Sequence, residues 1–102
     1  HYDNKVRFRI NVGVAYGSDT ALVKKLLLET AKENAFILKF PAPLVRFTDF
    51  GSSSLDFELL FYCKNFIVIE DIKSDLRFEI DRKFREADIN IPFPQRDVWI
   101  RQ

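Results

Sequence analysis

Methionine is absent from this sequence, and histidine and cysteine occur once each, as His1 and Cys63. A single cysteine excludes an intrachain disulfide and a metal site built from several cysteines, and it fits a reducing compartment best. A natural reading frame starts with a methionine that is rarely removed before a side chain as large as histidine. We therefore expect residues 1–4 to be a tag remnant or linker, and the parent protein to extend N-terminally.

Long apolar runs and an excess of one charge are missing as well. No stretch of about 18 or more apolar residues occurs, so nothing here is predicted to span a bilayer, and the N-terminus lacks the apolar block of a signal peptide. Sixteen basic against fifteen acidic residues leave a net charge of +1, which provides no long-range field to attract nucleic acid or an anionic membrane. The net charge therefore indicates no particular binding partner.

Apolar residues are plentiful enough for one domain. Of the 102 residues, 47% are hydrophobic, which allows a contiguous core without disulfides or metal. We expect residues 5–102 to form a single domain cut from a larger protein.

Two periodicities follow each other in the first third of the chain. Every even position from residue 6 to 16 is apolar, which predicts a long strand with one buried face. A Gly-Ser-Asp turn at 17–19 ends this strand and offers side chains that can cap a helix. Apolar residues at helical spacing over 22–31 then predict an amphipathic helix of roughly four turns.

A connector and a hairpin are predicted next. Residues 34–43 contain two prolines, which favour an extended path into a strand at 44–50. A Gly-Ser-Ser-Ser turn at 51–54 leads to a strand at 55–63, in which apolar and polar residues alternate. The two strands are predicted to pair as a β-hairpin.

A second amphipathic helix is predicted to begin around Glu70. Acidic residues stand at its positive end and basic residues near its negative end, which suits the helix dipole. The pairs Glu79–Lys83 and Asp81–Arg85 have favourable i,i+4 spacing. We interpret this run of charges as a solvated helix face and not as a binding patch.

A short closing strand at 97–101 completes the predicted order β-α-β-β-α-β. That order is typical of the ferredoxin-like fold, an α+β arrangement with an antiparallel-containing four-stranded sheet and both helices on one face. The first and third strands are then neighbours, so Arg7 and Arg9 could pair with Asp56 and Glu58 across the open face. Such exposed pairs contribute about 0–1 kcal/mol each, so they set register more than stability.

Residues suited to catalysis are few. His1 is excluded as a remnant, and Cys63 continues the apolar face of its strand, so we interpret it as a buried structural thiol. The turn at 17–19 could hold an anion, but a helix cap is the favoured interpretation, and an acylphosphatase-like enzyme would need an arginine there. We predict no enzyme activity, no cofactor and no metal site.

RNA-recognition modules share this strand order, and the sequence holds eleven phenylalanines that could stack on bases. The glycine- and aromatic-rich signature of such modules is absent from 54–62. Phe57 and Phe61 share the phase of the leucines in their strand and are predicted to face the helices. Asp56 and Glu58 would repel a phosphate backbone, so we predict no nucleic-acid partner.

A solitary soluble domain does not explain the ending of the chain. Its Pro-Phe-Pro sequence is stiff and apolar, and the tryptophan points away from the face assigned to the core. We predict a subunit-interface or assembly site made of Pro92, Phe93, Pro94, Gln95 and Trp99. The alternative is that the two aromatic residues cap the domain's own core.

Four segments, in order, resemble the cytoplasmic C-terminal domain of the small-conductance mechanosensitive channel (MscS) family. They are 12–27 with Val-Gly-Val-Ala-Tyr-Gly-Ser-Asp, 37–43 with Pro-Ala-Pro, 47–55 with Phe-Thr-Asp-Phe-Gly-Ser-Ser-Ser-Leu, and 82–98 with Pro-Phe-Pro-Gln. Two positions depart from the family pattern. Phe40 stands where an acidic residue is usual and adds exposed apolar surface; Asp88 replaces a glycine common after the second helix, and can adopt the same left-handed cap at some cost.

The resemblance implies a homo-oligomeric membrane channel, usually of seven copies, in which this domain forms the lower wall of a vestibule on the cytoplasmic side of the inner membrane. Its implied roles are assembly, filtering of ions and solutes, and modulation of gating during osmotic downshock. The transmembrane segments would precede this piece, which is expected to be soluble and to self-associate weakly in isolation. The alternative is a free-standing ferredoxin-like ligand-sensing or regulatory module.

Overall fold

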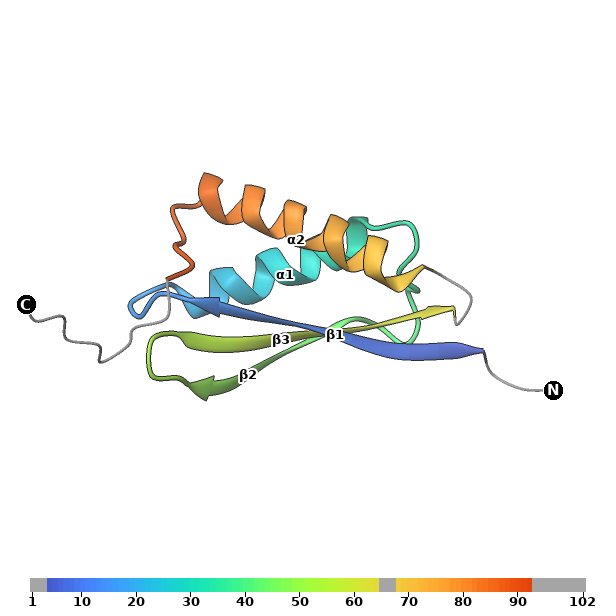
Figure 1. Cartoon of the computed structure of the whole chain (residues 1–102), viewed down its shortest axis with the longest axis horizontal. Coiled ribbons are helices and arrows are strands. Elements are labelled where there is room, and N and C mark those ends of the chain that lie inside the picture. Colours follow the sequence, from blue (N-terminus) through green and yellow to red (C-terminus); the bar gives the residue numbers. More distant parts are fainter. Residues whose placement is uncertain (1–3, 65–67, 93–102) are drawn as a thin grey trace, which may run out of the picture.

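The computed structural model describes residues 4–64 and 68–92 and arranges them in two layers, a sheet and a pair of helices (Figure 1). The elements, in chain order, are β1 (Lys5–Val14), α1 (Thr20–Glu33), β2 (Leu44–Phe50), β3 (Leu55–Lys64) and α2 (Ile69–Glu86). This order confirms the first three predicted strands and both predicted helices. The predicted closing strand at 97–101 lies outside the described residues.

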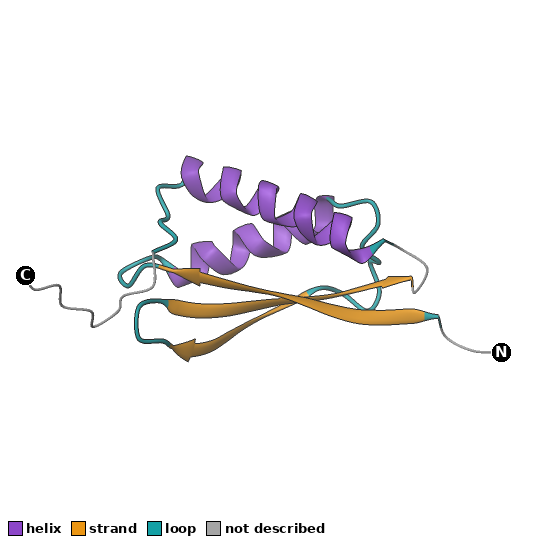
Figure 2. Ribbon diagram, viewed as in Figure 1, coloured by secondary structure: helices purple, strands orange, loops and turns teal. Residues whose placement is uncertain are grey.

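The sheet has the strand order β1-β3-β2, and both pairings are antiparallel. Both helices cover one face of the sheet, and no described element covers the opposite face (Figure 2). The fold is therefore α+β, as predicted, with a three-stranded antiparallel sheet in the described part. The fourth strand, and with it the complete ferredoxin-like topology, stays a prediction.

The core lies between the two layers and follows the predicted periodicities. Its buried residues come from one face of each strand, from the inner stripes of both helices, and from the connecting segments: Ile10, Val12, Val14, Val23, Leu27, Ala31, Ile37, Val45, Leu55, Phe57, Leu59, Phe61, Cys63, Ile72, Leu76, Ile80, Phe84 and Ile89. The places of Phe57 and Phe61 in this cluster confirm that they face the helices. Tyr16 does not join it, because β1 ends at Val14 and leaves Tyr16 exposed, with its hydroxyl donating to the Gly51 carbonyl.

The turn between β1 and α1 is organised by its own polar groups. The Asp19 carboxylate accepts a hydrogen bond from the Leu22 N–H at 3.2 Å, and the Ser18 hydroxyl donates to the Ala15 carbonyl at 2.7 Å. Gly17 has a φ of 92°, in the left-handed region that favours glycine. Asp19 is therefore the helix cap, and its negative charge also suits the positive end of α1.

The two helices are joined by a buried lysine. The sequence suggests a pair between Glu79 and Lys83, but Glu79 instead forms its ion pair with Arg82, at 2.7 Å. Lys83 is buried on the side of α2 that faces α1, and its ammonium lies 3.0 Å from the carboxylate of Glu33. The prediction from i,i+4 spacing is wrong here because the tertiary contact draws the lysine across to the other helix.

The C-terminus of α2 is capped by a residue in the left-handed conformation. Asp88 has a φ of 59°, and the Ile89 N–H bonds to the Phe84 carbonyl at 2.8 Å, which is the bond pattern of a Schellman cap. The expectation that aspartate can replace glycine in this cap is confirmed. Beyond it, the Ala15 N–H bonds to the Asn90 carbonyl at 2.8 Å, so the chain leaves the helix beside the end of β1.

Neither helix, within residues 4–64 and 68–92, is long and apolar enough to cross a bilayer. In α2, which is the longer of the two at 18 residues, charged side chains occupy most of the outer surface.

Candidate functional site

Only one of the five residues predicted to form an assembly site belongs to the described part of the chain. Pro92 is half-buried, and the preceding Ile91 is exposed. The other four lie outside the described residues: Phe93, Pro94, Gln95 and Trp99. Their assembly role stays a prediction, and Pro92 is the part of the motif that the structure places.

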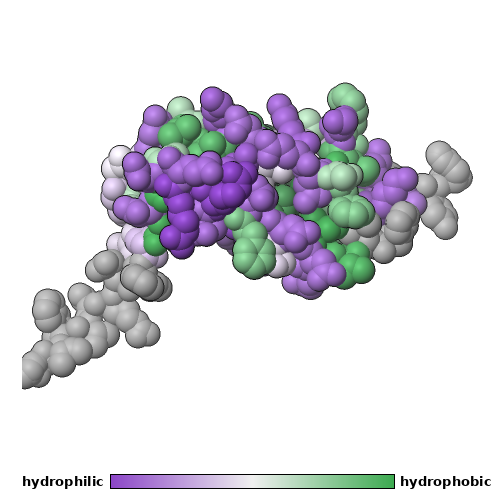
Figure 3. All heavy atoms as spheres, turned by 90° about the horizontal axis from the view of Figure 1, so that it is seen from above, coloured by the Kyte–Doolittle hydropathy of each residue, from purple (hydrophilic) through white to green (hydrophobic). Residues whose placement is uncertain are grey.

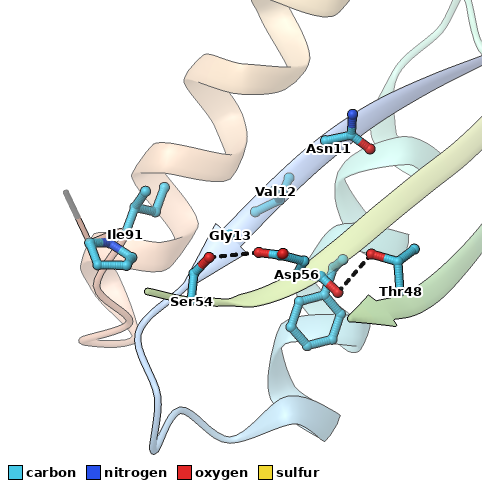
Figure 4. A pocket seen from close by; sticks show the side chains of 9 residues that line it. Asn11, Val12, Gly13, Thr48, Ser54, Asp56 and Ile91 are labelled. Atoms are coloured by element: carbon cyan, nitrogen blue, oxygen red, sulfur yellow. Dashed lines mark hydrogen bonds between the residues drawn. The ribbon is translucent and has the colours of Figure 1, made fainter. Parts of the chain in front are cut away.

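Ile91 and Pro92 form one wall of an open hollow of about 480 Å³ at the end of the sheet (Figure 4). The Ser54 hydroxyl donates to the Asp56 carboxylate at 2.6 Å, and the Thr48 hydroxyl donates to the Asp56 carbonyl at 3.2 Å. These polar groups of the lining are thus already bonded to one another. The hollow is suited to shallow contact with another chain more than to enclosing a small ligand.

No arrangement for catalysis comes together in the described residues. Among them, no group of three or more His, Cys, Asp and Glu side chains is placed to hold a metal ion. Burial raises the pKa of the Cys63 thiol, which keeps it in the neutral form that is a poor nucleophile. The Asp19 carboxylate caps α1 and would repel an anion at the turn where one could otherwise bind.

The bare sheet face carries one of the ion pairs predicted from the pairing of β1 with β3. The Arg9 guanidinium donates to the Glu58 carboxylate at 2.8 Å, which confirms that these two strands present charges to the same face. Asp56 bonds to the Ser54 hydroxyl instead. Arg7 makes no ion pair within the described residues, so the predicted network is only partly formed.

Two residues of this bare face are buried, although the alternation of apolar and polar residues predicts that the face is exposed. Glu58 and Leu60 point away from the helices, yet they are only 6% and 4% exposed. Leu60 lies between Arg9 of β1 and Leu44 of β2 in the strand register, and long neighbouring side chains can shield it without a covering layer. The sequence already indicated partial burial of this face, because Leu60 and Tyr62 follow Asp56 and Glu58 at positions where a fully solvated strand face would carry polar residues.

Several phenylalanines stand on the surface. On strand β2, Phe50 is exposed and packs on Phe47 with ring centroids 5.0 Å apart, and Phe47 stacks at 4.7 Å on the buried ring of Phe57 in β3. Phe40 is 80% exposed, as expected from the sequence, and Phe78 on α2 is 73% exposed. Seen from the helix side, hydrophobic residues surface in separate places on a mostly hydrophilic exterior (Figure 3).

The second half of α2 is a network of exposed ion pairs. Asp81 and Arg85 form the predicted pair at 2.9 Å, and Arg82 reaches Glu79 and Glu86 at 2.7 and 3.0 Å. The hydrogen bond from Arg82 lowers the pKa of Glu79, and the bond to Asp81 raises the pKa of Arg85. Because these cations are neutralised within their own helix, the interpretation as a solvated face holds for this half of α2.

Comparison with known proteins matches residues 8–91 to the family described as "Mechanosensitive ion channel MscS, C-terminal". The mechanosensitive channel MscK of Escherichia coli is 43% identical over 98 residues, which cover 96% of this chain and 9% of MscK. The small-conductance mechanosensitive channel of Helicobacter pylori is 35% identical over 89 residues, which cover 87% of this chain and 32% of that protein. The chain thus spans only 9% and 32% of the length of these two relatives.

A solved structure has the same fold. The crystal structure of Helicobacter pylori MscS in the closed state aligns with a TM-score of 0.84 and 32% sequence identity, over 98% of this chain and 40% of that chain. The similarity therefore extends from local motifs to the arrangement of the whole domain.

Proposed function

The chain belongs to the family of MscS C-terminal domains, and on that premise we propose that it forms part of the vestibule wall of a mechanosensitive ion channel, on the cytoplasmic side of the membrane. The match of residues 8–91 to this family carries the proposal. The 43% identity with a channel of Escherichia coli supports it. In this proposal residues 5–102 are one domain of a longer membrane protein, and residues 1–4 are a remnant or linker.

The domain would act through shape and contacts and not through chemistry. We propose three roles for it: holding copies together, filtering the ions and small solutes that reach the pore, and modulating gating during osmotic downshock. The partner would be the same chain, in a homo-oligomer of seven copies. The buried thiol and the internally bonded lining of the hollow support a structural role of this kind.

The C-terminal motif from Pro92 to Gln95, together with Trp99, is proposed to serve assembly. The Schellman cap and the bond between Ala15 and Asn90 support this role, because they hold the start of the motif against the end of β1. A segment that leaves every copy from the same defined place can meet its counterparts in a symmetric oligomer.

A chimera tests the proposal. The corresponding segment of Escherichia coli MscK is replaced by residues 5–102, and the chimera is expressed in cells that lack their own mechanosensitive channels. We expect tension-activated currents in membrane patches and survival of osmotic downshock. A control chimera carrying Leu27→Asp, which places a charge in the core, should lose both. A chimera that reaches the membrane in normal amounts but gives neither current nor survival would contradict the proposal and favour the ligand-sensing alternative.

The assembly motif is tested in the same chimera by Phe93→Ala and Trp99→Ala. We expect each to impair oligomer stability or inactivation more than unitary conductance, because the motif lies outside the pore. Phe40→Ala is the control, since it removes an exposed aromatic ring from the connector between α1 and β2. Unchanged oligomer stability and gating in both motif variants would show that the motif has no such role.

A further inference from the structure

We propose that the bare face of the sheet in one copy binds the outer face of α2 in the next copy. The inference rests on the proposed function, which brings copies of this chain side by side, and it deepens that function by naming the two surfaces that meet. The two surfaces lie on opposite sides of the molecule, below the sheet and above the helices (Figure 1).

The basic half of the bare face has an apolar centre with cations around it. In the strand register, Leu60 and Tyr62 of β3 lie opposite Arg9 and Arg7 of β1, and Leu44 of β2 lies on the other side of Leu60. Leu44 is exposed and Tyr62 is half-buried, so this centre is partly open to a partner. We call it the sheet patch.

The cations of the sheet patch are only partly balanced by carboxylates of the described residues. Arg9 is paired with Glu58, which is itself buried. Arg7 and Arg46 make no ion pair within residues 4–64 and 68–92. Arg46 lies opposite Glu58 in the register, so Glu58 stands between Arg46 and Arg9, whereas Arg7 lies farther along the face, opposite Tyr62. An incoming partner therefore meets excess positive charge around an apolar centre.

The outer face of α2 offers the complementary pattern. Asp71, Ser74, Asp75 and Phe78 follow one another at i, i+3, i+4 and i+7, which places them on one stripe of the helix. Neither aspartate makes an ion pair in the described part of the chain, and Phe78 is 73% exposed. We call this the helix patch. Arg77, which also borders Phe78, lies off the stripe at i+6 from Asp71.

The two patches match in both apolar character and charge. The ring of Phe78 can cover Leu44 and Tyr62, and arginine is the cation that packs best on an aromatic face. The two aspartates can then bind Arg7 and Arg46 as carboxylate–guanidinium pairs. A polyanion such as RNA is a poorer occupant, because the Glu58 carboxylate borders the apolar centre and Tyr62 is the one aromatic residue among those that define the patch.

The symmetry of the contact also follows from its two unlike surfaces. When a patch on one side of a chain binds a different patch on the opposite side of the next chain, the contact is heterologous and repeats around a ring. A contact between two sheet patches would instead close a two-fold dimer. The proposed contact is therefore the kind that an assembly with an odd number of copies requires.

Directional cross-linking tests the proposal with the 102-residue chain itself. Asn11→Cys places a thiol on the rim of the sheet patch, and Ser74→Cys places one in the helix patch, while both leave the charged groups and Phe78 intact. Cys63 is fully buried and stays unreactive in each variant. With a short bismaleimide, we expect a mixture of the two variants to give at least five-fold more dimer than either variant alone. Equal yields, or dimers mainly from Asn11→Cys alone, would overturn the proposal.

Three further changes identify the groups that make the contact. Phe78→Ala, Asp71→Asn with Asp75→Asn, and Arg7→Glu with Arg46→Gln are each expected to reduce the mixed cross-link at least five-fold. Position 46 is neutralised and not reversed, because Glu58 lies opposite it. Phe40→Ala and Lys24→Gln, which alter exposed residues off both patches, should keep the yield within two-fold. If the mixed cross-link were lost with the changes to Arg7 and Arg46 but kept with the changes to the helix patch, a different partner would bind the sheet face. That result would overturn the inference.

This test is separate from that of channel function. A failed chimera together with a directional cross-link would reject the proposed function and retain the contact. A working chimera without a directional cross-link would do the opposite.

Discussion

The two faces of β3 are specified in different ways. Towards the helices the strand presents five buried side chains that only the chain's own packing touches: Leu55, Phe57, Leu59, Phe61 and Cys63. On the other face, Glu58 and Leu60 are buried although no described element covers them, and Tyr62 is partly open. The first face is filled by the domain's own core, whereas the second combines buried groups with Arg7 and Arg46, which make no ion pair within residues 4–64 and 68–92. Packing against the helices thus defines one side of the strand, and the other side carries the surface for which we propose a contact between copies.

The largest difference between the two faces is expected when adjacent residues of β3 that face opposite ways are truncated. Phe61→Ala removes a fully buried ring and is expected to lower the free energy of unfolding by about 3–5 kcal/mol. Tyr62→Ala, its neighbour on the bare face, should cost about 1 kcal/mol or less, because its ring is already partly solvated. Urea unfolding followed by circular dichroism measures both. Similar losses in the two variants would mean that the faces are not different.

The buried thiol of Cys63 should make the stability of the core face depend on pH. Burial raises the pKa of this thiol in the folded chain, whereas in the unfolded chain it ionises near its ordinary pKa of about 8.5. Below that pH the thiol is neutral in both states. As pH rises above it, the unfolded state loses the proton first, so the wild-type chain should lose stability relative to Cys63→Ala by at most about 1.4 kcal/mol per pH unit.

The measurement is the difference in unfolding free energy between wild type and Cys63→Ala from pH 7 to 10. Other groups that titrate in this range are common to both chains and cancel. Parallel curves across the whole range would contradict a raised pKa.

The Arg9–Glu58 pair tests how much the bare face contributes to stability. Glu58 is buried but Arg9 is largely exposed, with 61% of its side chain accessible, so water screens their attraction. A double-mutant cycle with Glu58→Gln and Arg9→Met should give a coupling energy of about 0.5–1 kcal/mol. A coupling above about 2 kcal/mol would show that this face is held as firmly as the core.

Lys83 gives the smallest expected effect. Its ion pair with Glu33 is buried on one side only, and such pairs are often replaced by apolar residues without loss. Lys83→Met is expected to change the free energy of unfolding by less than about 1 kcal/mol. The effect should shrink further at high salt. A large salt-independent loss would show that the lysine is held by more than its carboxylate partners.

Much of the fold could be predicted from residue patterns because the core faces obey strict periods. The alternation in β1 and β3, the stripes of α1 and α2, and the cap at Asp19 each depend on neighbours within a few residues. The predicted antiparallel neighbours β1 and β3 then explained the pair between Arg9 and Glu58. Local spacing was sufficient for these features because their partners lie on the same element or on the neighbouring strand.

Prediction failed where a more distant partner decided the outcome. Lys83 pairs with Glu33 of α1 and not with Glu79, which helical spacing cannot show. Tyr16 lies beyond the end of β1, and its hydroxyl donates to the carbonyl of Gly51 in the hairpin turn. The exposure of Phe78 was not predicted either, since many phenylalanines in the sequence do serve the core. Of the predicted assembly site, only Pro92 could be compared with the structure, so that prediction is still to be tested by the chimera.

The bond between Ala15 and Asn90 has a mechanical consequence. It holds Asn90 beside the carboxyl end of β1, while Lys5 starts the strand at its other end. A pull between Lys5 and Asn90 would therefore act along β1 and shear its ten-residue register with β3. Interstrand bonds lie across the strand direction, so they would share such a load and not open one by one. A load applied between these two residues would thus be carried along the sheet with little extension.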